Sequence, residues 1–186
     1  MALTLNGSTN TIGGLAVGGL PDGTVDSDTL AAGVGGKFAS YAIIADRKTQ
    51  NTNGGTITAG AWRTRDLNTE IADADGIVSI SSNQFTLQAG TYDLIAHFQI
   101  LKPGDRGGSR LYNITDSSVV ETGESIFGNT NATFVFNLYS RFTISAAKVF
   151  EIQNRVNTTY TTYGAGVAGN HTAELYTYVE IFKEVS

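Results

Sequence analysis

Few side chains in this sequence are of the types that perform catalysis or hold metal ions. There is no cysteine, and His97 and His171 are the only two histidines. His97 falls in the middle of an expected strand, where a histidine usually packs at a sheet surface or an interface, and His171 falls in a loop. No Gly-x-Ser-x-Gly elbow marks a nucleophile. The sequence therefore predicts no metal site and no bound cofactor.

Pairs of carboxylates are the remaining candidates for chemistry, because two acids held about 5–9 Å apart can hydrolyse a glycosidic bond. Three such pairs occur: Asp26 with Asp28, Asp73 with Asp75, and Glu121 with Glu124. All three lie in or beside expected loops, where solvated acids are the ordinary outcome. The Asp73 loop also lacks the rest of a calcium-binding EF-hand. We expect no enzyme, and a glycan-degrading activity is the least favoured alternative.

Aromatic side chains in loops rich in Asn and Thr favour a binding surface instead. Tyr160, Tyr163 and Trp62 are of the type that stacks on sugar rings, since each has a large rigid ring and a polar group. They are the candidates for glycan contact. Tyr176 and Tyr178 could act in the same way, but packing at a subunit interface is the favoured interpretation for these two.

Composition predicts an all-β fold. The 186 residues include 22 glycines and only 2 prolines, and Thr, Val, Ile, Tyr and Phe outnumber the helix-favouring Lys and Glu. No segment has a persuasive helical period. The net charge of −5 argues against a nucleic-acid partner. No apolar run is long enough to insert in a membrane, and the first residues do not resemble a secretion signal, so we expect synthesis in a cytoplasm without a signal peptide.

The strand expected at 91–100 follows a short strand at 84–87 and a glycine turn. One face of this strand is wholly apolar and consists of Tyr92, Leu94, Ala96, Phe98 and Ile100. The other face is only half polar, because Ile95 and His97 lie there beside Asp93 and Gln99. A strand of this kind suits a two-layer fold whose back is covered by another subunit.

Further strands are expected along residues 38–184, with a loop at 102–108. Their ranges are 38–48, 56–68, 77–80, 109–114, 119–122, 131–144, 148–156 and 172–183. Roughly eight to ten strands with short turns predict a β-sandwich or jelly roll. Both faces of the last strand look buried. The candidates for a trimer interface are Ile95, His97, Tyr176, Tyr178 and Phe182.

The first 37 residues differ from the rest, which form a domain at 38–186. Nine of the glycines precede residue 37, and the apolar side chains are small and widely spaced. Such a segment cannot bury enough surface alone to offset its ordering entropy. We expect an extended arm that becomes ordered against a partner. Its docking candidates are Leu15, Val17, Leu20, Val25 and Leu30.

Five stretches of the domain, taken in order, resemble a C-terminal domain of tail-fibre-like proteins from bacteriophages and prophages. They span residues 62–69, 77–92, 110–115, 142–151 and 174–181. That domain is similar to the tumour-necrosis-factor-like, complement-type jelly roll, in which a Gly-x-Tyr sequence opens a central strand. Gly90-Thr91-Tyr92 matches this feature. The arm around residues 11–25 also resembles N-terminal segments of phage structural proteins.

The resemblance implies a homotrimer, in which three subunits pack side by side at the surface of a phage particle. It favours a tail-fibre or receptor-binding protein that attaches the particle to polysaccharide on the host surface, with the arm docked in other virion proteins. The alternative is a capsid decoration or cement trimer, of the head-fibre type, that stabilises the capsid. Fibres usually have a long shaft, whereas only 37 residues precede this domain, so a short tip or knob is expected. The resemblance implies no catalytic residues.

Overall fold

A computed structural model describes residues 4–6, 11–13, 36–101, 105–128 and 132–185. The chain divides into two compact units, Met1–Lys37 and Phe38–Ser186. In the first unit β1 (Thr4–Asn6) pairs antiparallel with β2 (Thr11–Gly13). All regular elements of the described residues are strands, which confirms the all-β prediction. In these same ranges no helix is long and apolar enough to cross a membrane.

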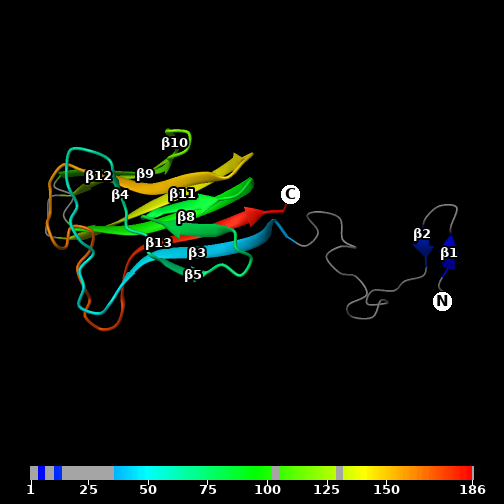
Figure 1. Ribbon diagram of the computed structural model, residues 1–186, viewed down its shortest axis with the longest axis horizontal. Coiled ribbons are helices and arrows are strands. Elements are labelled where there is room, and N and C mark those ends of the chain that lie inside the picture. The colour runs from blue at the N-terminus through cyan, green and yellow to red at the C-terminus, as the bar shows by residue number, and fades with distance from the viewer. Residues whose placement is uncertain (1–3, 7–10, 14–35, 102–104, 129–131, 186) are drawn as a thin grey trace. The chain divides into compact units, whose positions relative to one another are not determined.

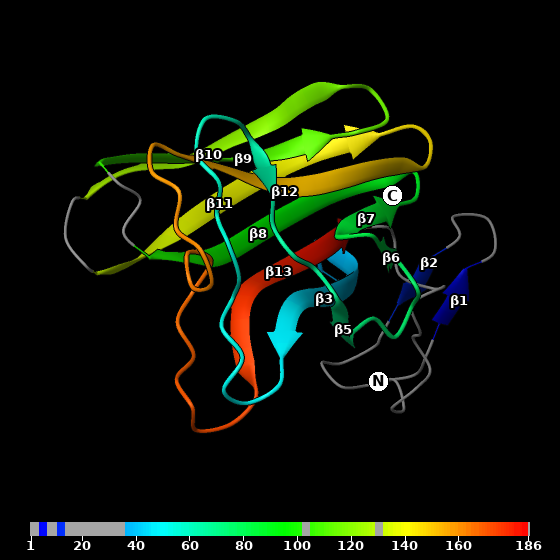
Figure 2. The same cartoon turned by 60° about the vertical axis from the view of Figure 1, so that its left-hand side comes forward.

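Two antiparallel sheets make up the second unit (Figures 1 and 2). The five-stranded sheet has the order β11 (Thr133–Ile144), β8 (Gly90–Leu101), β13 (Glu174–Glu184), β3 (Phe38–Lys48), β5 (Thr69–Ala72). The six-stranded sheet has the order β10 (Ser118–Gly128), β9 (Asp105–Asn113), β12 (Lys148–Val156), β7 (Gln84–Leu87), β6 (Val78–Ser81), with β4 (Arg63–Thr64) also paired to β12. Neighbouring strands are mostly distant in sequence, as in a jelly roll, so the predicted sandwich is confirmed.

Alternating side chains from both sheets fill the core. The apolar row of β8 from Tyr92 to Ile100 points inward and is almost completely buried. From the other sheet, Phe85 and Phe150 stack with their ring centroids 5.6 Å apart. Each large side chain buried in this way stabilises the fold by about 1.5–3 kcal/mol. Burial of one face of each strand also fixes the register, because a slip of one residue would turn the apolar row outward.

Four expected elements differ from the structure. The strand expected at 119–122 is part of the longer β10, so Glu121 and Glu124 lie on a strand. Residues 56–68 form no long strand; only Arg63–Thr64 pairs regularly, and an isolated bridge joins Ile57 to Tyr160. The loop expected at 102–108 is shorter, because β9 already begins at Asp105. The segment after residue 68, expected as a loop, contributes the edge strand β5.

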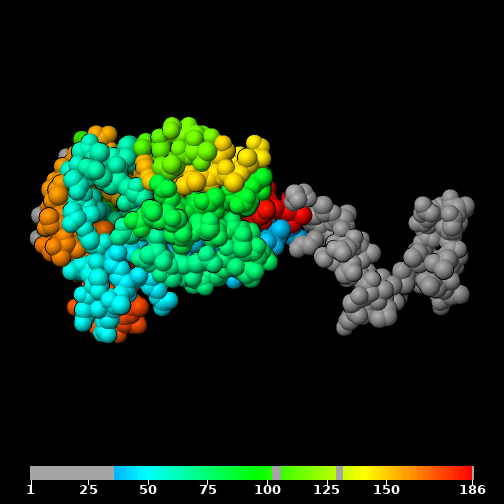
Figure 3. Space-filling view, in the orientation of Figure 1, coloured from blue at the N-terminus to red at the C-terminus, as the bar shows by residue number. Residues whose placement is uncertain are grey.

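Both ends of the domain lie at one end of the sandwich. Phe38 at the start of β3 stands opposite Glu184 at the end of β13, and Lys48 stands opposite Glu174 at the other end of the same two strands. Segments 49–62 and 157–173 extend beyond that second end, which we call the loop end. Figure 3 shows them, in cyan to teal and in orange, over the side of the domain away from the red C-terminal strand.

Candidate functional site

Two segments of the loop end lie side by side (Figure 2). Residues of both segments line one wall of a pocket. Ile57 and Tyr160 exchange two backbone hydrogen bonds of 3.0 Å, and the Ala165 N–H donates to the Gly55 carbonyl at 3.0 Å. At Gly54 a Cβ atom would lie 2.6 Å from the Ala165 carbonyl, so this close approach requires glycine. The two loops therefore hold each other through their backbones.

The pocket lies where the core ends and has a volume of about 370 Å³. Asp46 follows Ile44 on the inward row of β3, and Asn154 follows Ile152 on the inward row of β12. Arg65 comes from the segment after β4, anchored by its N–H to the Ile152 carbonyl at 2.8 Å. The three polar side chains are at most 2% exposed and line the pocket. Polar groups thus occupy positions that the strand pattern would assign to core residues.

Arg65 is held by partners from both the sheet and the loop. Its Nε donates to the Thr177 hydroxyl at 3.3 Å, and one Nη donates to the Ala165 carbonyl at 3.1 Å. The guanidinium also lies 5.2 Å from the centroid of the Phe98 ring. Burial lowers the pKa of Arg65 to about 10, although Asp46 favours the charged form. The side chain therefore remains a fixed positive charge at neutral pH.

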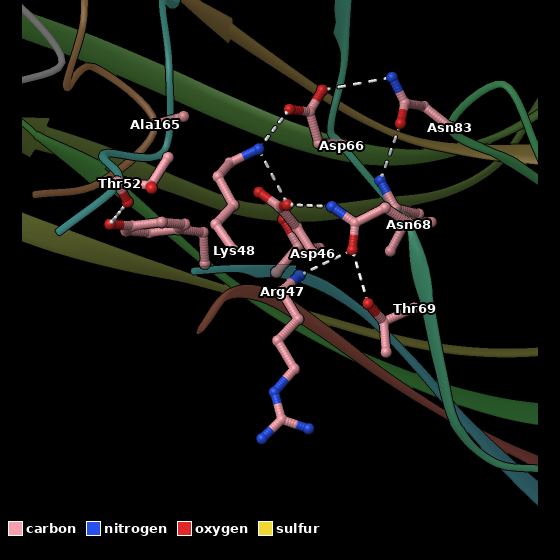
Figure 4. A network of polar contacts seen from close by, with 12 residues as sticks. Asp46, Arg47, Lys48, Thr52, Asp66, Asn68, Thr69, Asn83 and Ala165 are labelled. Atoms are coloured by element: carbon pink, nitrogen blue, oxygen red, sulfur yellow. Dashed lines mark hydrogen bonds and ion pairs between the residues drawn. The ribbon is translucent and has the colours of Figure 1, made fainter. Parts of the chain in front are cut away.

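A network around Asp46 fixes the negative side of the pocket (Figure 4). Lys48 Nζ reaches between Asp46 Oδ1, at 3.0 Å, and Asp66 Oδ2, at 2.9 Å. Asn68 donates to Asp46 Oδ1 at 2.7 Å, and Asn83 donates to Asp66 at 3.3 Å. Burial raises the pKa of Asp46, and the ammonium of Lys48 opposes that rise. The network orients both carboxylates.

Two side chains in this pocket keep buried atoms without a hydrogen-bond partner among the described residues. They are Asp46, through Oδ2, and Asn154, through both Oδ1 and Nδ2. A buried polar group without a partner costs about 1–3 kcal/mol. The amide of Asn154 therefore destabilises the free domain unless something in the pocket bonds to it.

Glu174 and the neighbouring Tyr176 fasten the two loops to the start of β13. The carboxylate of Glu174 accepts backbone N–H bonds from Gly169 at 2.9 Å, Asn170 at 3.0 Å and Asn51 at 3.2 Å. These bonds, led by that from Gly169, lower the pKa of Glu174. The loop end is thus a structured surface with many specific contacts.

The structure separates the three glycan-contact candidates. Tyr160 and Tyr163 lie on the loop that walls the pocket, and Tyr163 is exposed. Trp62 packs elsewhere: the Arg110 guanidinium lies 4.2 Å from its ring centroid and 4.5 Å from that of Tyr112. One face of the tryptophan ring is therefore covered by the chain itself. Sugar contact by these three residues stays a prediction.

Four interface candidates share the outward face of the five-stranded sheet. They are Ile95, His97, Tyr178 and Phe182. Cross-strand register places His97 beside Tyr178 on one side and Asn137 on the other, and His97 Nδ1 lies 2.7 Å from the Asn137 amide oxygen. We call this surface the sheet face; its role as an interface stays a prediction.

Other large side chains extend the sheet face, although they were not among the candidates. Tyr139 is 59% exposed, Tyr41 is 53% exposed and Val135 is 51% exposed. Tyr139 stands opposite Ile95, and the Tyr41 ring stacks on Phe182 with centroids 6.4 Å apart. Val135 and Tyr139 alternate with the buried Phe136 and Leu138, so both lie on the outward side of β11, and their size was the signal for including them.

Tyr176 lies mostly inside its own chain. It lies at a register shift between Leu175 and Thr177, it is 3% exposed, and its hydroxyl donates to the Thr52 carbonyl at 2.8 Å. Only a small edge of the Tyr176 ring borders the sheet face near His97.

The arm candidates fall outside the described residues, as does one acidic pair. They are Leu15, Val17, Leu20, Val25 and Leu30, with Asp26 and Asp28.

The remaining acidic residues close turns or pair locally. Both carboxylate oxygens of Asp73 accept backbone N–H bonds, from Ile77 at 2.8 Å and Val78 at 3.0 Å. Glu124 accepts the Asn137 amide at 2.8 Å. Within the described ranges no group of three or more His, Asp or Glu side chains could hold a metal ion.

Solved structures with a similar fold include two animal proteins. The globular domain of zebrafish complement 1qA protein aligns with a TM-score of 0.50 and 14% identity, over 77% of this chain and 96% of that one. Murine APRIL at pH 5.0 aligns with a TM-score of 0.54 and 6% identity, over 77% and 98%. No family model and no curated protein sequence matches the chain. At these identities the likeness concerns the fold alone, and the domain is a jelly roll of the tumour-necrosis-factor and complement type.

Proposed function

We propose that this chain forms a homotrimeric surface domain of a bacteriophage particle, of the tail-fibre or receptor-binding type, which attaches the particle to host glycans. The sheet face carries the proposal, because Tyr139 and Tyr41 are more than half exposed there beside Ile95 and Phe182. Exposed aromatic and aliphatic patches of this kind mark interaction surfaces. The family resemblance implies three subunits side by side, and such packing would cover the sheet face.

The two ends of the domain have different roles in this proposal. The chain enters the domain at Phe38, at the end of β3 opposite the loop end. The arm docks in other virion proteins through its apolar side chains. The loop end, with Tyr160, Tyr163 and the polar pocket, faces the host surface.

Light scattering on the full chain tests the trimer. We expect a mass three times that of the 19.6 kDa chain. Tyr139→Asp places a charge on the sheet face at a site too exposed to matter for the monomer fold, and should give monomers. Val119→Asp is the matched control, since Val119 is 48% exposed on β10 of the other sheet, and should stay trimeric. A wild-type monomer at micromolar concentration would refute the proposed interface.

Particle assembly tests the arm and separates attachment from capsid decoration. Deleting residues 1–36 should leave a protein that no longer joins particles; if it still joins, the docking role of the arm is wrong. Gel densitometry of purified particles then counts copies. A few copies support the tail-fibre assignment, whereas many copies per particle support a decoration trimer. Binding of the purified protein to host cells, lost after removal of surface polysaccharide, tests glycan attachment directly.

A further inference from the structure

The side chain of Asn154 is unusual among those buried at the loop end. Its amide oxygen and its amide nitrogen are both buried, and neither has a hydrogen-bond partner in the described part of the chain. Asp46 Oδ2 is in the same situation. Native proteins pair nearly all buried polar atoms. Since both side chains line the pocket, the missing partners point to a molecule that enters it.

The charges around the pocket favour an uncharged molecule. Asp46 and Asp66 are matched by Arg63 and Arg65 in the lining, and the ammonium of Lys48, which is not part of the lining, is already paired with both carboxylates. An anion would approach two carboxylates, and a cation would approach two guanidinium groups, so the lining itself selects neither sign of charge. The unpartnered atoms comprise a donor and an acceptor on Asn154 and a further acceptor on Asp46. Hydroxyl groups match this set, because each can both donate and accept.

Size and access also fit a small polyhydroxylated ring. The volume of about 370 Å³ lies within the range of roughly 300–1,000 Å³ that is typical of small-molecule sites. Exposed Thr56, Thr58 and Thr64 surround the opening and add hydroxyls, while buried Ile57 and Ala165 provide apolar wall. A pyranose has hydroxyls at its edge and C–H groups on its faces, which suits a polar floor with an apolar wall.

We propose that the pocket floored by Asp46, Arg65 and Asn154 binds one residue of a neutral sugar. The Asn154 amide bonds to two neighbouring hydroxyls, as donor to one and acceptor from the other, and Asp46 Oδ2 accepts from a third. This inference rests on the proposed attachment to glycans and identifies where the glycan is recognised. The occupant that competes with it is ordered water, which would satisfy the same atoms.

Chemical-shift mapping on the ¹⁵N-labelled full chain tests the proposal. The probes are the methyl glycosides of glucose, galactose and mannose, each at about 10 mM, a concentration that would fill most of a site with a Kd of about 1 mM. Glucuronate at the same concentration is the anionic comparison. The side-chain NH₂ signal of Asn154 is identified as the one that is missing from the spectrum of Asn154→Leu. We expect at least one neutral glycoside to shift that signal together with the backbone amides of residues 54–58.

Two variants locate the binding. Asn154→Leu should abolish the shifts at residues 54–58, whereas Asn157→Leu, an exposed asparagine just beyond the same strand that does not line the pocket, should leave them unchanged. No shift with any glycoside means that water alone occupies the pocket, and the proposal is then wrong. Larger shifts with glucuronate than with the neutral glycosides would show that the pocket prefers an anionic sugar, and the proposal of a neutral ligand would then be wrong. Shifts that Asn157→Leu removes would place sugar binding on the outer surface instead.

Binding to host cells distinguishes this inference from the proposed function. If the wild-type protein and Asn154→Leu bind host cells equally, attachment stands and the pocket is not where the glycan is recognised. If a glycoside shifts Asn154 but the protein binds no host cells, the pocket binds sugar and attachment is wrong. We expect cell binding by the wild type and by Asn157→Leu, and at least a tenfold loss for Asn154→Leu.

Discussion

Replacing Asn154 by leucine should stabilise the domain. The two side chains have similar shapes, and the substitution removes two buried atoms without hydrogen-bond partners in the described residues. Each such group costs about 1–3 kcal/mol, of which water in the pocket recovers a part. We therefore expect the free energy of unfolding to rise by about 1–2 kcal/mol. For a domain of this size the melting temperature should rise by about 2–4 °C per kcal/mol.

Gln153→Leu is the matched comparison, because it removes the adjacent amide from the opposite side of β12. Gln153 accepts a 2.7 Å bond from Arg110 Nε and donates a 2.6 Å bond to Glu151. Hydrogen bonds to charged groups contribute about 1.5–3 kcal/mol each, so this variant should be less stable than the wild type. Guanidinium unfolding at one fixed protein concentration measures both, since self-association would make stability depend on concentration. A loss of stability in Asn154→Leu as large as in Gln153→Leu would refute our account of the pocket.

Two further predictions concern how the loop end is fastened. Backbone N–H groups, led by that of Gly169, lower the pKa of Glu174 below its usual value of 4.5. The stability that these hydrogen bonds contribute is therefore present above about pH 4.5. It is lost as the pH falls through the lowered pKa. The melting temperature should therefore fall less between about pH 5 and pH 3 in Glu174→Gln than in the wild type, and equal falls would exclude this role. Gly166 has a φ of +138°, and a Cβ atom there would lie 2.2 Å from the Tyr176 ring. Gly166→Ala should therefore lower the free energy of unfolding, measured by thermal unfolding, by about 2–4 kcal/mol. Gly76→Ala, at a φ of +65° with open space around it, should cost only about 1 kcal/mol, and similar losses in the two variants would refute the steric argument.

Alternation along the strands predicted the sandwich and most of its inward rows. The row from Tyr92 to Ile100 is buried as expected, because a strand with one apolar face has only one register that covers it. The same logic placed Ile95 and His97 on the outward face. It did not show that Tyr176, beside a shift of register, is covered by the chain's own loops through Thr52 and Gly166. Such an irregularity leaves the spacing of apolar residues unchanged and is therefore invisible in the pattern.

The pocket was not predicted, because its parts come from segments that meet only after folding. Asp46 and Arg65 are 19 positions apart in sequence, and Asn154 comes from the opposite sheet. A weak signal existed: Asp46 and Asn154 each continue an inward apolar row with a polar side chain. A polar residue at a core position indicates a binding or structural role, but the sequence does not reveal which other groups lie opposite it.

The placement of both domain ends at one end of the sandwich has a mechanical consequence. A pull between a ligand at the loop end and an anchor at Phe38 acts along β3 and β13, whose backbone hydrogen bonds run across that direction. Many bonds then share the load at once, in shear. A pull that separates Phe38 from Glu184 would instead open the same pair one bond at a time. In the attachment that we propose, tension between host and particle would load the domain in its more resistant direction.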